Sequence, residues 1–368
     1  MKNMFSLTPV WSEEQLEVLN SEPNLIVRGF AGSGKTLLAI HIGIKRAIEY
    51  KERVLIVVFT KTLARVIENY LEKLNLGHNK LTVVFHGKLQ YSPLSLIKPD
   101  VLIVDEFQDF TQQDLVEFLK NTKKNYFIGD DDQSLYDYQY NSGRRTLSQD
   151  DIVNKTKFPV LYLTKNLRSG KGLELLAQQI FWANNESKEV GILENYYAKC
   201  MMGLNPDDNN GNKFLNCFIT SFNDNEEVDE TVWLYDSLKE YKKNFPDETI
   251  AVLVMDNDRV RQLHEIFQQH RLSHGYKIEN ELSSNFLKED ITLMTYHSAK
   301  GLEFAHVFLP YSNKLLNEKS FWQRAYFTAI TRAVKSINLT FSRSSDYQCE
   351  FRLQWLLDKY PTFNYQRI

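Results

Sequence analysis

The chain has 368 residues, 43% hydrophobic and 25% charged, which is typical of a globular protein with room for two domains. Its 44 basic and 47 acidic residues give a net charge of −3, which excludes a globally basic nucleic-acid binder and leaves a local groove for such a ligand. We expect a cytoplasmic protein outside membranes: no apolar run is long enough to span a bilayer, the N-terminus lacks a signal-peptide core, and Cys200, Cys217 and Cys349 are scattered.

Strands and helices are predicted to alternate along the first half. Continuous apolar runs predict strands buried on both faces at 25–28, 52–60, 81–87, 101–109 and 125–130. Helices are predicted over 12–20, capped by Ser12, and over 37–50, 63–74 and 111–122. This order predicts a parallel, doubly wound α/β sheet, whose ligands bind at the carboxyl ends of the strands.

The second half repeats this alternation and predicts a second parallel sheet. Strands are expected within 159–169, 249–255, 291–304 and 336–341. Helices are expected over 172–185, 227–245 and 258–270, and residues 205–212 have the composition of a loop. We therefore predict two domains, residues 1–165 and residues 166–368.

The segment GFAGSGKT, Gly29 to Thr36, joins a predicted strand to a predicted helix and predicts a phosphate-binding loop. Its backbone N–H groups, at Gly29, Ala31, Gly32, Ser33 and Gly34, are expected to turn around phosphate oxygens near a helix N-terminus. Lys35 is expected to reach the β- and γ-phosphates, and Thr36 to hold Mg²⁺. The sequence thus predicts a nucleoside triphosphate site, with ATP and Mg²⁺ as cofactors.

The segment DEFQD, residues 105–109, ends a predicted strand with acidic side chains. With a phosphate loop upstream, Asp105 is predicted to complete the Mg²⁺ site and Glu106 to orient or deprotonate the attacking water. The alternative is an acidic cluster that faces solvent.

Six segments resemble motifs of superfamily 1 helicases of the UvrD/Rep/PcrA type: GFAGSGKT, DEFQD, GDDDQSLYDY (129–138), LTKNLRS (163–169), MTYHSAKGLEF (294–304) and RAYFTAITRA (324–333). Together with Gln15 and with VFTKTLARV (58–66) and VVFHG (83–87), which also resemble family segments, they occur in the family's order between residues 15 and 333. The resemblance implies two RecA-like P-loop NTPase domains with ATP in the cleft between them. It also implies movement from 3′ to 5′ along single-stranded DNA, with RNA left open as an alternative strand.

The resemblance also implies residue roles at the nucleotide. Gln15 stands where the family reads adenine, although a solvated helix glutamine is the alternative. Arg168 is implied to touch the γ-phosphate, and Arg332 to act as an arginine finger. Gly301 and Glu303 are implied to face the γ-phosphate and the ribose.

Six residues are implied to contact nucleic acid: Phe59, Thr60, His86, Tyr138, Thr295 and His297. Phe59 is as well explained by core packing, and Tyr138 replaces the family's usual tryptophan. Gln133 is implied to couple the γ-phosphate to the DNA groove.

The chain departs from the family at several places. Leu167 replaces the tyrosine that stacks on adenine. The intervals between Phe59 and Asp105 and between Arg168 and Thr295 are too short for the family's large 1B and 2B insertions, and only YSNKLLNEKS stands where the family has a strand-separating hairpin.

These features leave two functional hypotheses. The first is an ATP-dependent DNA helicase or translocase. The alternative is a nucleic-acid-gated ATPase subunit that serves a partner, such as a nuclease in DNA repair or anti-phage defence. A non-enzymatic binding module is the third class, which the retained Lys35, Glu106 and Arg332 argue against.

Overall fold

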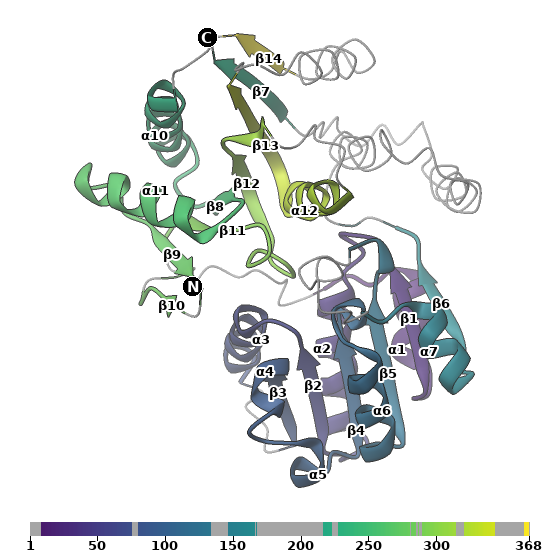
Figure 1. Ribbon diagram of the computed structural model, residues 1–368. Helices are drawn as coiled ribbons and strands as arrows, with labels where there is room; N and C mark the ends of the chain where they lie inside the picture. The colour runs from purple at the N-terminus through teal and green to yellow at the C-terminus, as the bar shows by residue number, and fades with distance from the viewer. Residues whose placement is uncertain are drawn as a thin grey trace. The chain divides into compact units, whose positions relative to one another are not determined.

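The computed structural model describes residues 9–75, 80–133, 146–165, 167, 216–222, 227–279, 281–284, 286, 289–313, 320–342 and 364–367. The chain divides into two compact units, Asn3–Arg168 and Ser169–Ile368 with Met1–Lys2. Each unit has its own sheet (Figure 1). Within the described ranges, no helix combines the length and apolarity needed to cross a membrane.

The first unit contains a six-stranded, wholly parallel sheet in the order β3-β2-β4-β5-β1-β6. Its strands are β1 (Leu25–Gly29), β2 (Val54–Val58), β3 (Leu81–Phe85), β4 (Val101–Asp105), β5 (Lys124–Gly129) and β6 (Val160–Leu163). Every residue of β2 and β4 is buried, as expected for strands covered on both faces. The predicted parallel sheet is confirmed.

The helices of the first unit begin at the caps that their sequences provide. They are α1 (Glu13–Asn20), α2 (Lys35–Ile48), α3 (Lys61–Lys73), α4 (His86–Leu89), α5 (Leu94–Ile97), α6 (Gln112–Asn121) and α7 (Gln149–Thr156). Ser12, Thr111 and Ser148 each form a capping box at a helix start, which satisfies backbone N–H groups that lack a partner inside the helix. The short helices α4 and α5 and the helix α7 are absent from the sequence-based prediction.

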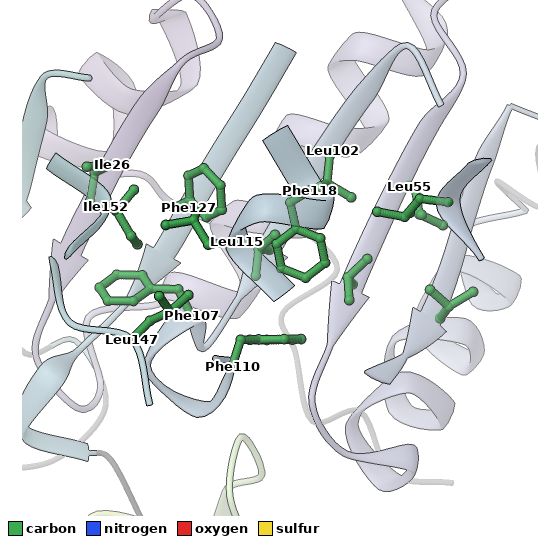
Figure 2. Packing of buried hydrophobic residues seen from close by; sticks show 14 residues of the cluster. Ile26, Leu55, Leu102, Phe107, Phe110, Leu115, Phe118, Phe127, Leu147 and Ile152 are labelled. Carbon is green, nitrogen blue, oxygen red and sulfur yellow. The ribbon is translucent and has the colours of Figure 1, made fainter. Parts of the chain in front are cut away.

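The main core of the first unit lies between the sheet and the segment after β4. Buried side chains from β1 to β5 meet Phe107, Phe110, Leu115 and Phe118 there, and the partly buried Val160 of β6 packs against them. Figure 2 shows Phe118 and Leu115 of α6 beside Leu102 of β4, with Phe110 below them. Each buried phenylalanine contributes a large apolar area, so this cluster fixes the chain that leaves the acidic end of β4.

The second unit contains an eight-stranded sheet in the order β10-β9-β11-β8-β12-β13-β7-β14. The strands are β7 (Asn216–Phe222), β8 (Ile250–Val254), β9 (Gly275–Ile278), β10 (Glu281–Leu282), β11 (Ile291–Thr295), β12 (Phe304–Leu309), β13 (Ala333–Ser342) and β14 (Asn364–Arg367). The described helices are α10 (Glu227–Asn244), α11 (Asn257–Gln269) and α12 (Ser320–Ile330). Leucines of α10 and apolar side chains of α11 pack on β8 and β11.

The second sheet differs from the prediction in three respects. It is parallel apart from β10, which pairs antiparallel with β9 at one edge. Within the segment 291–304, only Ile291–Thr295 (β11) is a complete strand; the chain then turns, and β12 begins at Phe304 and continues to Leu309. The strands β7, β9, β10 and β14 were missed, since their sequences mix polar and apolar residues without the continuous apolar run of a central strand.

Replacement of Phe110 by alanine tests the core. The side chain is fully buried and lies edge-to-face with Phe59, His86 and Phe118, so we expect Phe110→Ala to lower the free energy of unfolding by about 3–5 kcal/mol. Urea unfolding of the full chain measures this. The control is Tyr91→Ala at a side chain 85% exposed, which should change stability by less than about 0.5 kcal/mol. Equal stability of both variants would contradict this assignment of the core.

Candidate nucleotide site and nucleic-acid interface

The predicted phosphate loop leaves β1 and enters α2. Gly34 precedes the helix with a φ of 79°, a left-handed conformation that glycine adopts without strain. The Lys35 ammonium is buried inside the loop and donates to the carbonyl oxygens of Gly29, at 2.6 Å, and Phe30, at 2.9 Å. The lysine therefore holds the loop curved around a cationic centre, at the N-terminus of a helix, which is where a phosphate binds.

Gln15 fastens α1 to the phosphate loop. Its Nε2 donates to the Ser33 carbonyl at 3.0 Å, and its Oε1 accepts from the Ser12 backbone N–H at 3.0 Å. A Cβ at Gly34 would lie 2.7 Å from this Nε2, so a glycine at this position avoids a steric clash with the Gln15 amide. Gln15 is buried, so it is not a solvated helix residue. Its predicted contact with adenine remains a prediction.

The two predicted magnesium residues lie in direct contact. Thr36 Oγ1 donates to Asp105 Oδ2 at 2.7 Å, which joins the start of α2 to the end of β4. A hydroxyl and a carboxylate oxygen are ligands that suit Mg²⁺, so Thr36 and Asp105 fit the expected ion. Burial, reinforced by the adjacent Glu106 charge, raises the pKa of Asp105 to about 7.

Glu106, the predicted base, follows Asp105 in a left-handed backbone conformation, with a φ of 57°. Its Oε2 accepts from Gln108 Nε2 at 2.5 Å, and both residues are buried. Gln108 Oε1 in turn accepts from the backbone N–H of Asp130 at 3.0 Å. Asp130 Oδ2 accepts from Gln133 Nε2 at 2.6 Å, so Gln133, a predicted coupling residue, is connected to Glu106. The alternative of a solvent-facing acidic cluster is wrong, since Asp105, Glu106 and Asp109 are buried.

The chain after β6 returns to the phosphate loop. The backbone N–H of Leu167 donates to the Gly32 carbonyl at 2.9 Å, and the backbone N–H of Thr164 donates to Glu14 of α1 at 2.8 Å. The Leu167 side chain is 53% exposed. Thus the residue that replaces the family tyrosine does lie beside the loop. The predicted roles of Tyr138 and Arg168 concern positions outside the described residues.

Three aromatic rings gather where β2 and β3 end. Phe59 stacks on His86 with ring centroids 5.2 Å apart, and both rings meet the edge or face of Phe110. His86 Nε2 lies 2.9 Å from Asp114 Oδ1. Phe59 packs on the core but is only partly buried. The structure is therefore compatible with both interpretations of this residue, core packing and contact with nucleic acid. Thr60 caps α3 by accepting from the Leu63 backbone N–H.

In the second unit, the turn after β11 carries two predicted nucleic-acid contacts. Thr295 Oγ1 donates to Ser298 Oγ at 3.0 Å, and the same Ser298 hydroxyl accepts from Lys277 Nζ at 2.9 Å. Burial, together with the charge of Lys300, lowers the pKa of His297 to about 4. His297 is therefore neutral at pH 7, and its predicted contact with a phosphate remains a prediction.

The predicted arginine finger, Arg332, is buried in the turn between α12 and β13. Its Nε donates to the Thr328 carbonyl at 2.9 Å and its Nη1 to the Leu302 carbonyl at 3.3 Å. Gly301 has a φ of 77°, and Glu303 follows it directly before β12. The Arg332 side chain thus links the Gly301–Glu303 segment to the end of α12 through hydrogen bonds to backbone carbonyls.

Comparison with known proteins supplies the wider context. The model of an AAA domain matches residues 13–139, and the model of the UvrD-like helicase C-terminal domain matches residues 272–344. The ATP-dependent DNA helicase PcrA of Bacillus subtilis (strain 168) is 30% identical over 112 residues, which cover 28% of this chain and 14% of that helicase.

Solved structures show the same fold. Dbp5 of S. cerevisiae bound to RNA and ADP BeF3 has a TM-score of 0.55 at 12% identity, covering 97% of this chain and 89% of that one. A Dbp5 variant with the same ligands has a TM-score of 0.56 at 13% identity, covering 97% and 88%.

The fold and the loop–acid arrangement define a P-loop nucleotide-binding protein with two RecA-like α/β domains. The two family models match successive parts of the chain, and each matched range contains segments that resemble helicase motifs. The chain is thus similar to UvrD-like superfamily 1 helicases: residues 272–344 match their C-terminal domain, and the aligned segment spans 14% of the length of PcrA.

Sequence reasoning missed Gln108, although it lies inside the DEFQD segment. The only available signal was its position two residues after Glu106. A single glutamine between acidic residues has no chemical signature of its own, and its two hydrogen bonds become visible only in three dimensions.

The raised pKa of Asp105 predicts a stability change of defined sign. The unfolded carboxyl titrates near 3.8 and the folded one near 7, so raising the pH through this window destabilises the folded protein. In buffer that contains a chelator of divalent ions, Asp105→Asn should be more stable than the wild type by up to about 4 kcal/mol at pH 8 and by little at pH 4, at about 1.4 kcal/mol for each unit of pKa shift. Thermal unfolding between pH 4 and 8 measures this gain.

The matched control is Glu117→Gln, which removes one negative charge from the exposed face of α6. A gain for Asp105→Asn that is constant across this pH range, or largest at acid pH, would contradict the assignment.

Proposed function

We propose that this protein is an ATP-dependent DNA helicase or translocase that hydrolyses ATP on single-stranded DNA, moving from 3′ to 5′. One observation carries the proposal: the hydrogen bond between Thr36 and Asp105, which brings the phosphate loop and the acidic end of β4 into contact within one unit. This contact supports one site that holds a triphosphate, a divalent ion and a general base.

In the proposed reaction, each residue of the first unit has a distinct task. Lys35 exchanges its two carbonyl acceptors for β- and γ-phosphate oxygens. Glu106 takes a proton from the attacking water. Thr36 and Asp105 would hold Mg²⁺, which neutralises developing phosphate charge when bound. Arg168 and Arg332 are proposed to stabilise the γ-phosphate.

The nucleic-acid contacts are proposed on two surfaces. In the first unit, the partly buried Phe59 offers a ring edge or face for a base, and Thr60 and His86 adjoin it. In the second unit, Thr295 and neutral His297 are proposed to hydrogen-bond phosphates. PcrA is an ATP-dependent DNA helicase, whereas Dbp5 was solved with RNA, so the strand preference of this chain is part of the proposal.

A second candidate is a nucleic-acid-gated ATPase subunit that acts with a partner such as a nuclease. The observation that favours it lies between Phe59 and Asp105. The described residues there form α3, β3, α4 and α5, which belong to the first unit and its sheet rather than to an inserted domain. A partner that supplies a duplex-separating element would compensate for the lack of an inserted domain among these described residues.

Replacing Glu106 by glutamine tests the ATPase. We expect Glu106→Gln to lower kcat by about 10²- to 10⁴-fold with little change in KM, because the amide cannot accept the proton from water. Steady-state ATP hydrolysis with and without single-stranded DNA measures both constants. The exposed Glu117→Gln variant should keep wild-type kinetics. Wild-type turnover in Glu106→Gln, or a wild-type protein inactive with and without DNA, would refute the proposed ATPase.

Replacing Phe59 by leucine tests the stacking contact. Leucine keeps apolar packing but removes the aromatic face, so affinity for single-stranded DNA should fall by about 5- to 100-fold, the equivalent of about 1–3 kcal/mol per base. Fluorescence anisotropy with matched DNA and RNA oligonucleotides measures the loss and the strand preference. Phe59→Tyr should retain binding. Unchanged affinity in Phe59→Leu would leave Phe59 as a core residue alone.

A further inference from the structure

A continuous chain of hydrogen bonds crosses the carboxyl edge of the first sheet. It runs from Glu106 to Gln108 at 2.5 Å, from Gln108 to the Asp130 backbone at 3.0 Å, and from Asp130 to Gln133 at 2.6 Å. Its side chains are buried, so water does not compete for these bonds. The chain links the end of β4 to the turn that follows β5.

We propose that Gln108 is a positioning residue that holds the Glu106 carboxylate in its reactive orientation and ties that orientation to the Asp130–Gln133 turn. The inference deepens the proposed function and rests on it, since Glu106 is the proposed base. The two ends of the Gln108 amide have separate roles. Its Nε2 donates to the Glu106 carboxylate and orients it, and its Oε1 accepts from the Asp130 backbone N–H and so follows any movement of the Asp130–Gln133 turn.

The backbone around Gln108 is shaped for this role. A Cβ at Gly129, directly before Asp130, would lie 2.4 Å from Gln108 Oε1 and 2.6 Å from a Phe107 ring carbon. Any other residue at position 129 would push the amide from its place. Glu106 itself has a left-handed backbone, which costs a non-glycine residue free energy and is held by its surroundings.

A purely structural role for Gln108 would account for only one of its two hydrogen bonds. The buried N–H of Asp130 needs one acceptor, and Gln108 Oε1 supplies it. The second arm ends on a carboxylate, where a charge-assisted bond is shorter and stronger than a neutral one. Since Gln133 bonds Asp130, a ligand that displaces Gln133 shifts the turn, and Gln108 transmits that shift to Glu106.

Two variants of the full-length protein separate the two arms. Gln108→Leu removes both bonds: we expect kcat with single-stranded DNA to fall about 10- to 100-fold, KM for ATP to change less than about threefold, and the ratio of kcat with DNA to kcat without DNA to approach 1. Gln108→Glu keeps the acceptor for Asp130 but sets a carboxylate against Glu106. Both kcat values should then fall in parallel, while the stimulation ratio stays near that of the wild type.

The controls are Gln113→Leu and Gln113→Glu on the exposed face of α6, with Glu106→Gln and thermal unfolding measured alongside. Folded Gln108 variants with wild-type kcat and stimulation would overturn the inference while leaving the ATPase proposal intact, and so would a change confined to KM. If instead the wild type does not hydrolyse ATP, or Glu106→Gln does not reduce hydrolysis, the proposed function fails and the role of Gln108 fails with it.

Discussion

Burial of charge at the end of β4 is the constraint on which the rest of the first unit depends. Asp105 has no exposed surface and lies beside Glu106, so two carboxylates share a volume from which water is excluded. Burial of an uncompensated charge costs several kcal/mol, so these groups need fixed partners. Thr36 supplies one at Asp105 and Gln108 supplies one at Glu106, and Lys35 adds a favourable charge nearby. The glycines of the loop and of β5 make this crowding sterically possible.

The hydrogen bonds that these side chains already form within the protein determine how a ligand is expected to bind. Lys35, Thr36, Gln15 and Gln133 already have hydrogen-bond partners in the protein. A triphosphate therefore exchanges existing bonds for new ones, and the net gain of each exchange is small compared with the strength of a bond in isolation. Affinity then depends on the charge-assisted bonds, which are the stronger class. Each exchange also frees a former protein partner, and the loop and turn must adjust to it.

Sequence alone predicted the parts of this site that strand order brings together. Parallel strands place their carboxyl ends on one edge, so a phosphate loop after β1 and acids after β4 were expected to meet, and Thr36 does contact Asp105. It could not predict Gln108, because an amide has the same composition signature whether it is solvated or buried in a network. Gln15 was predicted only through the family resemblance, and its hydrogen bond to the Ser33 carbonyl was not foreseen. The short helices α4 and α5 were missed for a related reason: a four-residue helix has no periodicity to detect.

The second unit shows the same principle with different chemistry. Thr295, Ser298 and Lys277 form a hydrogen-bonded cluster, and Arg332 donates to two backbone carbonyls. A guanidinium has five N–H donors in a fixed plane, so Arg332 can hold Thr328 and Leu302 with some donors while others are directed elsewhere. Its burial strengthens these bonds and fixes the turn before β13. In its proposed role at the γ-phosphate, an arginine held in this way would lose little side-chain entropy on meeting the anion, and such pre-organisation is what charge stabilisation in a reaction requires.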